Sequence, residues 1–240
     1  MTPEELIARA TDPRQYDHPD MDWPLQGAPG TPTARYYQQV LREALSGMRP
    51  RAALDIGCGT GHLEPLLREL GATRVAGIEP ASRNVAVARR AFPALELIEG
   101  SLAGASLPGG FDLALAVMSF EHQPDLRAAF RSVARLLAPG GAFVLITGDP
   151  EFHRTPRFDL RLEVRELADC STVVATGYPF GTIHDIIRPP ALVLAAAAAE
   201  GFTLERRVAL RPTAVLIETD PRWRELMDRA HGHLFVLRRN

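Results

Sequence analysis

The sequence predicts an α/β fold in which helices cover both faces of a mostly parallel β-sheet. Short apolar segments alternate along the chain with segments of helical periodicity, and the first predicted strand, residues 52–56, leads into a loop with glycine at positions 57, 59 and 61. The segment 111–118 has the composition of a strand buried on both faces. With 240 residues, 46% of them hydrophobic, the chain can bury one substantial core. We therefore expect one α/β domain with a cap rather than two independent domains.

Residues 1–50 are expected to form two helices and a lid ahead of the sheet. Thr2 and Glu5 have the spacing of a capping box before a short helix that ends near Ala10. Residues 11–33 are rich in proline, aspartate and glycine and are predicted to form a loop or lid. A second helix is predicted to begin at Thr33 and to stop at Gly47.

Residues 51–148 are expected to form the core of the sheet. The predicted strands lie at residues 52–56, 74–78, 95–98, 111–118 and 142–147. Helices are predicted between them at residues 63–70, 82–92 and 126–137, and Pro139-Gly140-Gly141 ends the last of these. This alternation is what predicts the parallel sheet.

Residues 149–188 interrupt the alternation with aromatic residues, arginines and turn residues. We interpret this segment as an insertion after the fifth strand that forms a substrate cap over the site. Residues 189–240 then complete the sheet, with a helix at 191–200, a strand near 203–210 and a last strand near 233–238.

Composition limits the partners and the chemistry. The formal net charge is -2 and there is no long basic run, so a large footprint for duplex nucleic acid, and hence a DNA partner, is not expected. All basic residues are arginine, which excludes lysine Schiff-base chemistry and a P-loop lysine. The two cysteines, Cys58 and Cys170, form no C-x-x-C pair, and no apolar run approaches the roughly 20 residues of a membrane span. We therefore expect a cytoplasmic protein with no metal site and no membrane partner.

The stretch Ala52–Gly61, AALDIGCGTG, predicts a ligand site at the carboxyl end of a buried strand. Glycine lets the backbone adopt positive φ and lets a ligand approach without interference from a Cβ atom. The spacing is G-x-G-x-G, with His62 where a dinucleotide-binding loop would have its last glycine. Considered by itself, this loop is compatible with a nicotinamide or flavin site and with a purely structural turn.

Five sequence blocks narrow this choice. They are LDIGCGTG, VAGIEP, LIEGSLAGASLP, FDLALAVMSFEH and LLAPGGAFVLIT, and they follow one another between about Arg51 and Gly148. With these blocks the chain resembles the class I S-adenosylmethionine-dependent methyltransferases, in particular the small-molecule branch with histidine after the fourth strand. The resemblance implies a Rossmann-like, doubly wound sheet of seven strands, with the last strand antiparallel beside the sixth. It also implies S-adenosyl-L-methionine as the cofactor.

The resemblance assigns cofactor roles to individual residues. It places Asp55 at the methionine amino group, the Glu79 carboxylate at the ribose hydroxyls and Pro80 on the adenine face. Many family members have aspartate after the glycine of the third strand, whereas here Ser101 follows Gly100. The Ser101 hydroxyl and the Leu102 amide would then serve adenine. The other positions expected at the cofactor are Gly57, Cys58, Gly59, Gly61, Met118 and Tyr37, although Tyr37 also fits a plain helix core.

Three residues are candidates for catalysis. His122 directly follows the fourth strand, where it can act as a base near neutral pH or simply shape the loop beside the cofactor. His184 and Tyr178 lie in the insertion. His184 is next to Asp185, but adjacent residues of a strand point to opposite faces, so a dyad is not assumed and a solvated polar turn remains an alternative.

Other side chains have two interpretations each. The arginines of the insertion can bind an anionic substrate or form a solvated face, and aromatic residues can form walls around the sulfonium and the acceptor. The arginines are Arg154, Arg157 and Arg161, and the aromatic residues are Tyr16, Trp23 and Tyr36 together with Tyr37.

The function expected from this resemblance is methyl transfer to an oxygen or nitrogen atom, less readily carbon, of a small organic molecule. Two alternatives remain open within the family: a methyltransferase that modifies tRNA or protein, and a member that binds the cofactor without transferring a methyl group. A nicotinamide dehydrogenase is the alternative outside it. The oligomeric state is open, with a homodimer considered.

Overall fold

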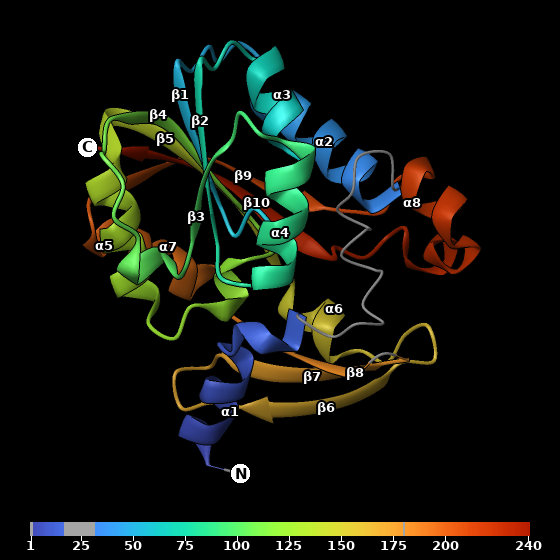
Figure 1. Ribbon diagram of the computed structural model, residues 1–240. Coiled ribbons are helices and arrows are strands. Elements are labelled where there is room, and N and C mark those ends of the chain that lie inside the picture. Colours follow the sequence, from blue (N-terminus) through green and yellow to red (C-terminus); the bar gives the residue numbers. More distant parts are fainter. Residues whose placement is uncertain (1, 17–31, 180) are drawn as a thin grey trace.

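The computed structural model describes residues 2–16, 32–179 and 181–240. In this part of the chain seven strands form one sheet in the order β3-β2-β1-β4-β5-β10-β9 (Figure 1). The strands are β1 (Ala52–Ile56), β2 (Arg74–Glu79), β3 (Glu96–Glu99), β4 (Phe111–Val117), β5 (Leu137–Gly148), β9 (Phe202–Leu210) and β10 (Gly232–Arg239). Strands β1 to β5 run parallel, and β10 is antiparallel to both of its neighbours, β5 and β9. The predicted fold class, including the antiparallel last strand beside the sixth, is confirmed.

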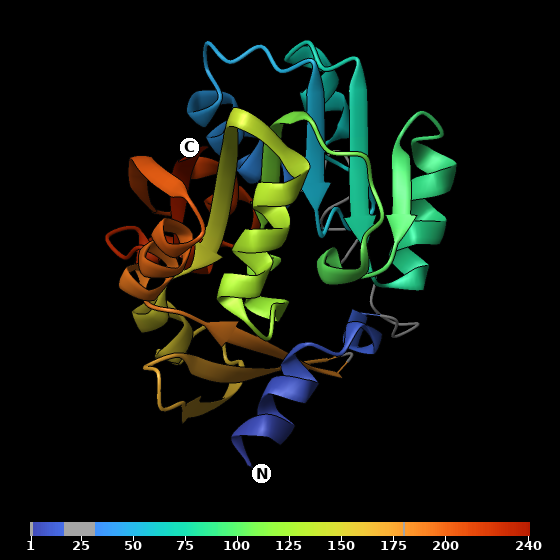
Figure 2. The ribbon, with the colours of Figure 1, turned by 90° about the vertical axis from the view of Figure 1, so that its left-hand side faces the viewer.

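Helices cover both faces of the sheet (Figures 1 and 2). On one face α2 (Pro32–Ala44) and α3 (Glu64–Glu69) pack against the sheet through Leu41 and Leu67, and α4 (Ser82–Ala91) lies on the same side. On the other face α5 (Leu126–Leu136) and α7 (Pro190–Ala199) pack through Phe130 and Val193.

The burial of strand β4 on both faces explains why nearly all of its residues are apolar. Leu113 and Leu115 are buried toward α2 and α3, whereas Ala114 and Ala116 are buried toward α5 and α7. Because successive residues of a strand point to opposite faces, a strand covered on both sides must be apolar at nearly every position. The prediction of a doubly buried strand is confirmed.

The insertion after β5 forms a second, antiparallel sheet. Strands β6 (Arg161–Glu166), β7 (Thr172–Tyr178) and β8 (Gly181–Ile187) pair in that order, after the short helix α6 (Pro150–Arg154). The first helix, α1 (Pro3–Ala10), packs on this sheet through Leu6 and Ala10 against Val173 and Ile186. Its predicted capping box is present. The chain's start and the insertion therefore lie together below the main sheet (Figure 1).

The prediction placed the start of β5 too late. α5 ends at Leu136 and the strand already begins at Leu137, so Pro139-Gly140-Gly141 do not end the helix but lie within β5, whose register against β4 shifts between Phe111 and Leu113. The three residues are thus an irregularity within a strand rather than a separate turn. Between β9 and β10 lie α8 (Ala214–Thr219) and the 3₁₀ helix η5 (Pro221–Leu226).

Three further 3₁₀ helices lie next to strand ends or follow α1: η1 (Pro13–Tyr16), η3 (Leu102–Gly104) and η4 (Phe120–His122). No helix among the described residues is long and apolar enough to cross a membrane.

Candidate active site

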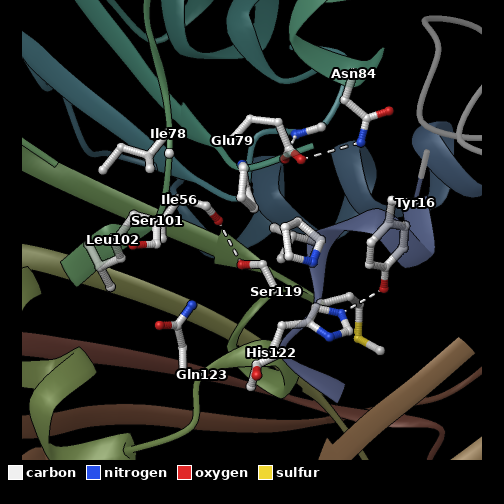
Figure 3. A pocket seen from close by; sticks show the side chains of 18 of the residues that line it. Tyr16, Ile56, Ile78, Glu79, Asn84, Ser101, Leu102, Ser119, His122 and Gln123 are labelled. Atoms are coloured by element: carbon white, nitrogen blue, oxygen red, sulfur yellow. Dashed lines mark hydrogen bonds between the residues drawn. The ribbon is translucent and has the colours of Figure 1, made fainter. Parts of the chain in front are cut away.

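The carboxyl ends of β1, β2 and β4 open into a cavity of about 680 Å³. The helix after β1 covers one face of the sheet and the helix after β4 covers the other, so the loops that leave these neighbouring strands diverge and a crevice remains between them. The cavity wall also includes the start of α4, the loop after β3 and residues 11–16. In Figure 3 the side chains of Glu79, Tyr16 and His122 face this space from three different elements.

The three predicted loop glycines lie in different surroundings. Gly59 lines the cavity, and a Cβ atom added there would meet no described atom within 4 Å. Gly57 also lines the cavity, but a Cβ atom there would lie 2.4 Å from Ser119 Cβ, so its missing side chain lets the loop after β4 come close. A Cβ atom on Gly61 would lie 2.9 Å from the Phe92 ring. Gly59 is thus the open part of the loop, whereas Gly61 serves packing against the end of α4.

Glu79 connects this loop to the next strand. Its carboxylate accepts hydrogen bonds from the Gly59 amide at 2.9 Å, from the Ala81 amide at 2.9 Å and from Asn84 Nδ2 at 3.4 Å (Figure 3). Burial raises the pKa of Glu79, and these hydrogen bonds act in the opposite direction. A carboxylate has about four acceptor positions, so Glu79 keeps acceptor capacity on the cavity wall.

Asp55 and Cys58 lie behind the wall rather than in it. Neither lines the cavity, and both are buried. Burial, with Glu79 nearby, raises the pKa of Asp55 to about 7. Cys58 packs against Gly77, where a Cβ atom would lie 2.7 Å from its sulfur, and burial raises the pKa of its thiol. Asp55, Cys58 and Gly61 therefore stay predictions as cofactor residues.

The remaining predicted cofactor residues do line the cavity: Pro80, Gly100, Ser101, Leu102, Met118 and Tyr37. Met118 has φ 51, which is uncommon outside glycine and costs backbone energy. This conformation occurs where the chain leaves β4 for η4, the short helix that carries His122.

His122 is held by groups from three segments. Its Nδ1 lies 2.9 Å from the Ala10 carbonyl oxygen, and its Nε2 lies 2.6 Å from the Tyr16 hydroxyl and 3.6 Å from Asp185 Oδ1. A carbonyl oxygen only accepts hydrogen bonds, so the geometry assigns the ring proton to Nδ1. In the neutral ring Nε2 is then an acceptor, and the Tyr16 hydroxyl donates to it (Figure 3). Burial lowers the pKa of His122, whereas the bond to Ala10 and the carboxylates of Glu121 and Glu79 raise it.

His184 and Asp185 are on opposite faces of β8, as expected for neighbours in a strand. Asp185 is the residue that approaches His122, whereas the His184 backbone amide donates to the Gln15 side chain at 2.9 Å. His184 and Tyr178 do not line the cavity, and their catalytic role stays a prediction.

The arginines that the sequence analysis considered for an anionic substrate have partners within the insertion. Arg161 on β6 is exposed and pairs with Glu163 at 2.8 Å, which agrees with a solvated face. Arg154 on α6 is partly buried, pairs with Glu166 at 3.2 Å and donates to the Thr172 hydroxyl. Arg157 donates to carbonyl oxygens of α6 and lies 4.3 Å from the centre of the Phe152 ring. Trp23 lies outside the described residues.

Tyr36 does not form a wall of the site, because it is 1% exposed in the core, with its hydroxyl 2.8 Å from His231 Nε2. Glu121 has a structural role, because its Oε1 accepts the Gly148 amide at 2.7 Å.

Sequence reasoning missed Thr60, His62 and Asn84 on the cavity wall. It considered Asp185 only as a possible partner of His184, whereas its carboxylate lies 3.6 Å from His122 Nε2. It also treated Tyr16 as an aromatic wall without recognising its bond to His122. Thr60 and His62 lie in or next to the glycine loop, so the stretch 52–61 could have indicated them. Tyr16, His122 and Asp185 come from segments far apart in the chain, so no residue spacing indicated that they meet. No group of three or more His, Cys, Asp or Glu side chains among the described residues is arranged to hold a metal ion.

Comparisons with known proteins agree with this geometry. A family model described as a methyltransferase domain matches residues 33–235. The ubiquinone biosynthesis O-methyltransferase of Xanthomonas campestris pv. campestris (strain B100) is 34% identical over 187 residues, which cover 72% of this chain and 70% of that protein.

Two solved structures extend the comparison. An S-adenosylmethionine-dependent methyltransferase from Mesorhizobium loti has a TM-score of 0.66 and 25% identity, covering 84% of this chain and 96% of that one. An amino pentose methyltransferase from Micromonospora echinaspora, solved with SAM bound, has a TM-score of 0.57 and 21% identity, covering 90% of this chain and 94% of that one. The second likeness concerns the fold alone.

Proposed function

The chain belongs to the S-adenosylmethionine-dependent methyltransferases of the class I fold, and from this premise we propose that it transfers a methyl group to an oxygen or nitrogen atom of a small organic molecule. The observation that carries the proposal is the cavity in which Glu79, tied to the glycine loop, stands at one end and His122 at the other.

The cavity wall fits a nucleoside with an amino-acid tail. Thr60 Oγ1 and His62 Nδ1 are buried and have no hydrogen-bond partner among the described residues, and both residues line the cavity. Buried polar atoms are normally satisfied, so these two atoms are suited to a ligand's polar tail. We place the ribose hydroxyls at Glu79, the adenine near Pro80, Ser101 and Leu102, and the tail along residues 57–62.

When bound, the cofactor supplies an electrophilic methyl group on a positively charged sulfur. The task of the protein is to hold the acceptor atom in line with the bond that breaks, and such positioning is worth roughly 7–11 kcal/mol of the barrier. Met118 and residues 11–16 line the part of the cavity near His122, so we assign acceptor positioning to them. We assign to His122 the role of the base that finally holds the acceptor's proton.

The enclosure of the cavity near His122 supports a small acceptor. The segment after α1 contributes Thr11, Asp12, Pro13, Gln15 and Tyr16 to the wall, and the cap sheet lies directly behind it. The Xanthomonas relative is named as an O-methyltransferase of ubiquinone biosynthesis, and this supports oxygen as the accepting atom. We accordingly propose that residues 1–50 form the N-terminal helices and lid and residues 149–188 the substrate cap. Residues 51–148 then form the cofactor-binding core, and residues 189–240 complete its sheet.

The test is to follow a labelled methyl group. The protein is incubated with S-adenosylmethionine that carries a CD₃ group and with a metabolite extract, an RNA fraction and a protein fraction in parallel, and each is analysed by mass spectrometry. We expect the label in a small molecule. Label only in RNA or in protein would support the first alternative, and binding of S-adenosylhomocysteine without label anywhere would support a member that does not transfer methyl groups.

A further inference from the structure

The bond between Tyr16 and His122 restricts what His122 can do. Its Nδ1 donates to the Ala10 carbonyl at 2.9 Å, and the lone pair of Nε2 accepts the Tyr16 hydroxyl at 2.6 Å. A neutral imidazole has one donor and one acceptor position. In this arrangement both are occupied, so His122 has no free nitrogen with which to take a proton directly from an acceptor.

Tyr16 is the group through which the proton can reach His122. The Tyr16 ring stands edge-on to the imidazole at 77°, with ring centres 5.2 Å apart, and both residues line the cavity. A phenol that donates its one proton still has lone pairs on oxygen to accept another hydrogen bond. The Tyr16 oxygen is therefore able to accept a hydrogen bond from an O–H or N–H group in the cavity.

Burial lowers the pKa of His122, and several groups around the ring act against this effect and support the positive charge after the proton arrives. Asp185 Oδ1 from the cap sheet lies 3.6 Å from Nε2, and the Ala10 carbonyl remains bonded to Nδ1. The other charged groups that act on His122 are Glu121 on its own 3₁₀ helix, Glu79 on β2 and Arg188 at the end of the cap. Two of these are carboxylates, and a nearby opposite charge favours the protonated imidazole.

We propose that Tyr16, rather than His122, is the catalytic residue that touches the acceptor, and that it relays the acceptor's proton to His122 Nε2 with Asp185 as a positioning residue. This inference rests on the proposed function. As the acceptor's lone pair forms its bond to the methyl carbon, the carbon–sulfur bond breaks and its electron pair stays on sulfur. The acceptor proton passes to the Tyr16 oxygen, and the Tyr16 proton passes to Nε2. The products are the methylated acceptor, a neutral thioether and an imidazolium.

The resting hydrogen bonds are tested by NMR on protein with ¹⁵N-labelled histidine and bound S-adenosylhomocysteine. His122→Gln identifies the His122 signals. We expect a proton on Nδ1 and an Nε2 shift that reports an accepted hydrogen bond, and we expect that shift to move in Tyr16→Phe. A proton on Nε2 in the wild-type protein would overturn the relay.

The relay itself is tested with two phenols at pH 8 and the CD₃-labelled cofactor. Catechol must lose a proton during transfer, whereas 4-nitrophenol is largely ionised already. We expect Tyr16→Phe to lower the rate with catechol about 100-fold and the rate with 4-nitrophenol by less than about threefold. The double variant that combines Tyr16→Phe with His122→Gln should methylate catechol no more slowly than the slower of the two single variants, because the two groups act in series. Equal losses with both phenols would overturn the relay.

Tyr36→Phe is the matched control. In the wild-type protein the Tyr36 hydroxyl also bonds a histidine nitrogen, His231 Nε2 at 2.8 Å, but neither Tyr36 nor His231 lines the cavity. We expect its rate with catechol to match the wild type. If the wild-type protein binds S-adenosylhomocysteine but methylates neither phenol, transfer to such oxygen atoms fails as a function. The NMR result then decides alone for or against the Tyr16–His122 arrangement.

Discussion

Two tyrosine–histidine pairs in this molecule have nearly the same geometry and different surroundings. In the cavity, Tyr16 Oη lies 2.6 Å from His122 Nε2, and in the core, Tyr36 Oη lies 2.8 Å from His231 Nε2. The ring centres are 5.2 and 5.3 Å apart. Only the first pair lines the cavity.

The two bonds run in opposite directions. Tyr36 donates its proton to the Arg211 carbonyl at 3.1 Å, so it must accept from His231 and the His231 proton is on Nε2. At His122 the carbonyl is on the other side of the ring, at Nδ1, so the tyrosine is the donor. The position of one backbone carbonyl thus decides whether a histidine is a proton acceptor or a fixed donor. Only the cavity pair is arranged to take up a proton through its tyrosine.

The largest difference should appear when each histidine is replaced. We expect His122→Gln to lower kcat for a protonated acceptor by about 100- to 10,000-fold, the usual contribution of a positioned base. His231→Gln should leave kcat within about threefold of the wild type. Steady-state kinetics at saturating cofactor measures both. Near-wild-type turnover in His122→Gln would make that histidine structural, provided the variant still binds S-adenosylhomocysteine.

The stability of the folded protein at acidic pH should depend on the Tyr36–His231 pair in the core. Burial lowers the pKa of His231 from 6.5 to about 4, with Asp149 raising it and Arg157 and His233 lowering it further. The unfolded chain then binds more protons than the native one between these values, so native stability falls as pH falls from about 6.5 to 4. We expect a loss of about 2 kcal/mol from this group between pH 7 and pH 5. Urea unfolding at pH 7 and pH 5 should show that the free energy of unfolding falls less in His231→Gln than in the wild type. An equal fall in both proteins would contradict the assignment of this acid sensitivity to His231.

Removing single hydroxyls should separate stability from activity. Tyr36→Phe leaves a buried N–H and a buried carbonyl without their partner, which costs about 1–2 kcal/mol of unfolding free energy. Tyr16→Phe should cost less, because water in the cavity can replace the lost hydroxyl. Thermal and urea unfolding at pH 7 compare the two variants. The reverse order of stability would mean that Tyr16 mainly anchors the N-terminal segment.

The smallest effect is expected at Asp185. Burial raises the pKa of Asp185 to about 7. Asp185→Asn keeps the shape of the side chain but removes its capacity to carry a negative charge 3.6 Å from His122 Nε2, so the protonated imidazole loses support. We expect kcat to fall about tenfold and the acidic limb of the pH–rate profile to move to lower pH, because the pKa of His122 falls. Asp169→Asn, in the turn before β7 and away from the cavity, is the control. An unchanged profile in Asp185→Asn would remove Asp185 from the relay.

Sequence patterns predicted the parts of the site that directly follow strands of the parallel sheet. The glycine loop and Glu79 each follow a strand, and the carboxyl ends of adjacent parallel strands must meet at one edge of the sheet. The prediction of Gly57, Gly59 and Glu79 at one place therefore needed only the order of the strands. The sheet formed by β6, β7 and β8 was missed. Only β6 alternates polar and apolar residues, as a half-buried strand does, whereas β7 and β8 have no such regular pattern.

The acceptor end could not be predicted in the same way. Tyr16, His122 and Asp185 come from η1, η4 and β8, and they meet only because α1 packs on the cap sheet through Leu6, Ala10 and Ile186. No residue spacing encodes this packing. The direction of the hydrogen bonds depends further on where single carbonyl groups lie, and that is a property of the folded backbone.

The central claim is that the cavity binds S-adenosylmethionine with Glu79 on the ribose, and calorimetry with S-adenosylhomocysteine tests it most directly. Glu79→Gln is compared with the wild type and with Glu99→Gln, which changes the carboxylate at the end of the neighbouring strand β3, outside the cavity wall. We expect micromolar binding in the wild type and in Glu99→Gln, binding weakened by about 1.5–3 kcal/mol in Glu79→Gln, and no heat with NAD. An unchanged dissociation constant in Glu79→Gln, or tighter binding of NAD, would contradict the claim.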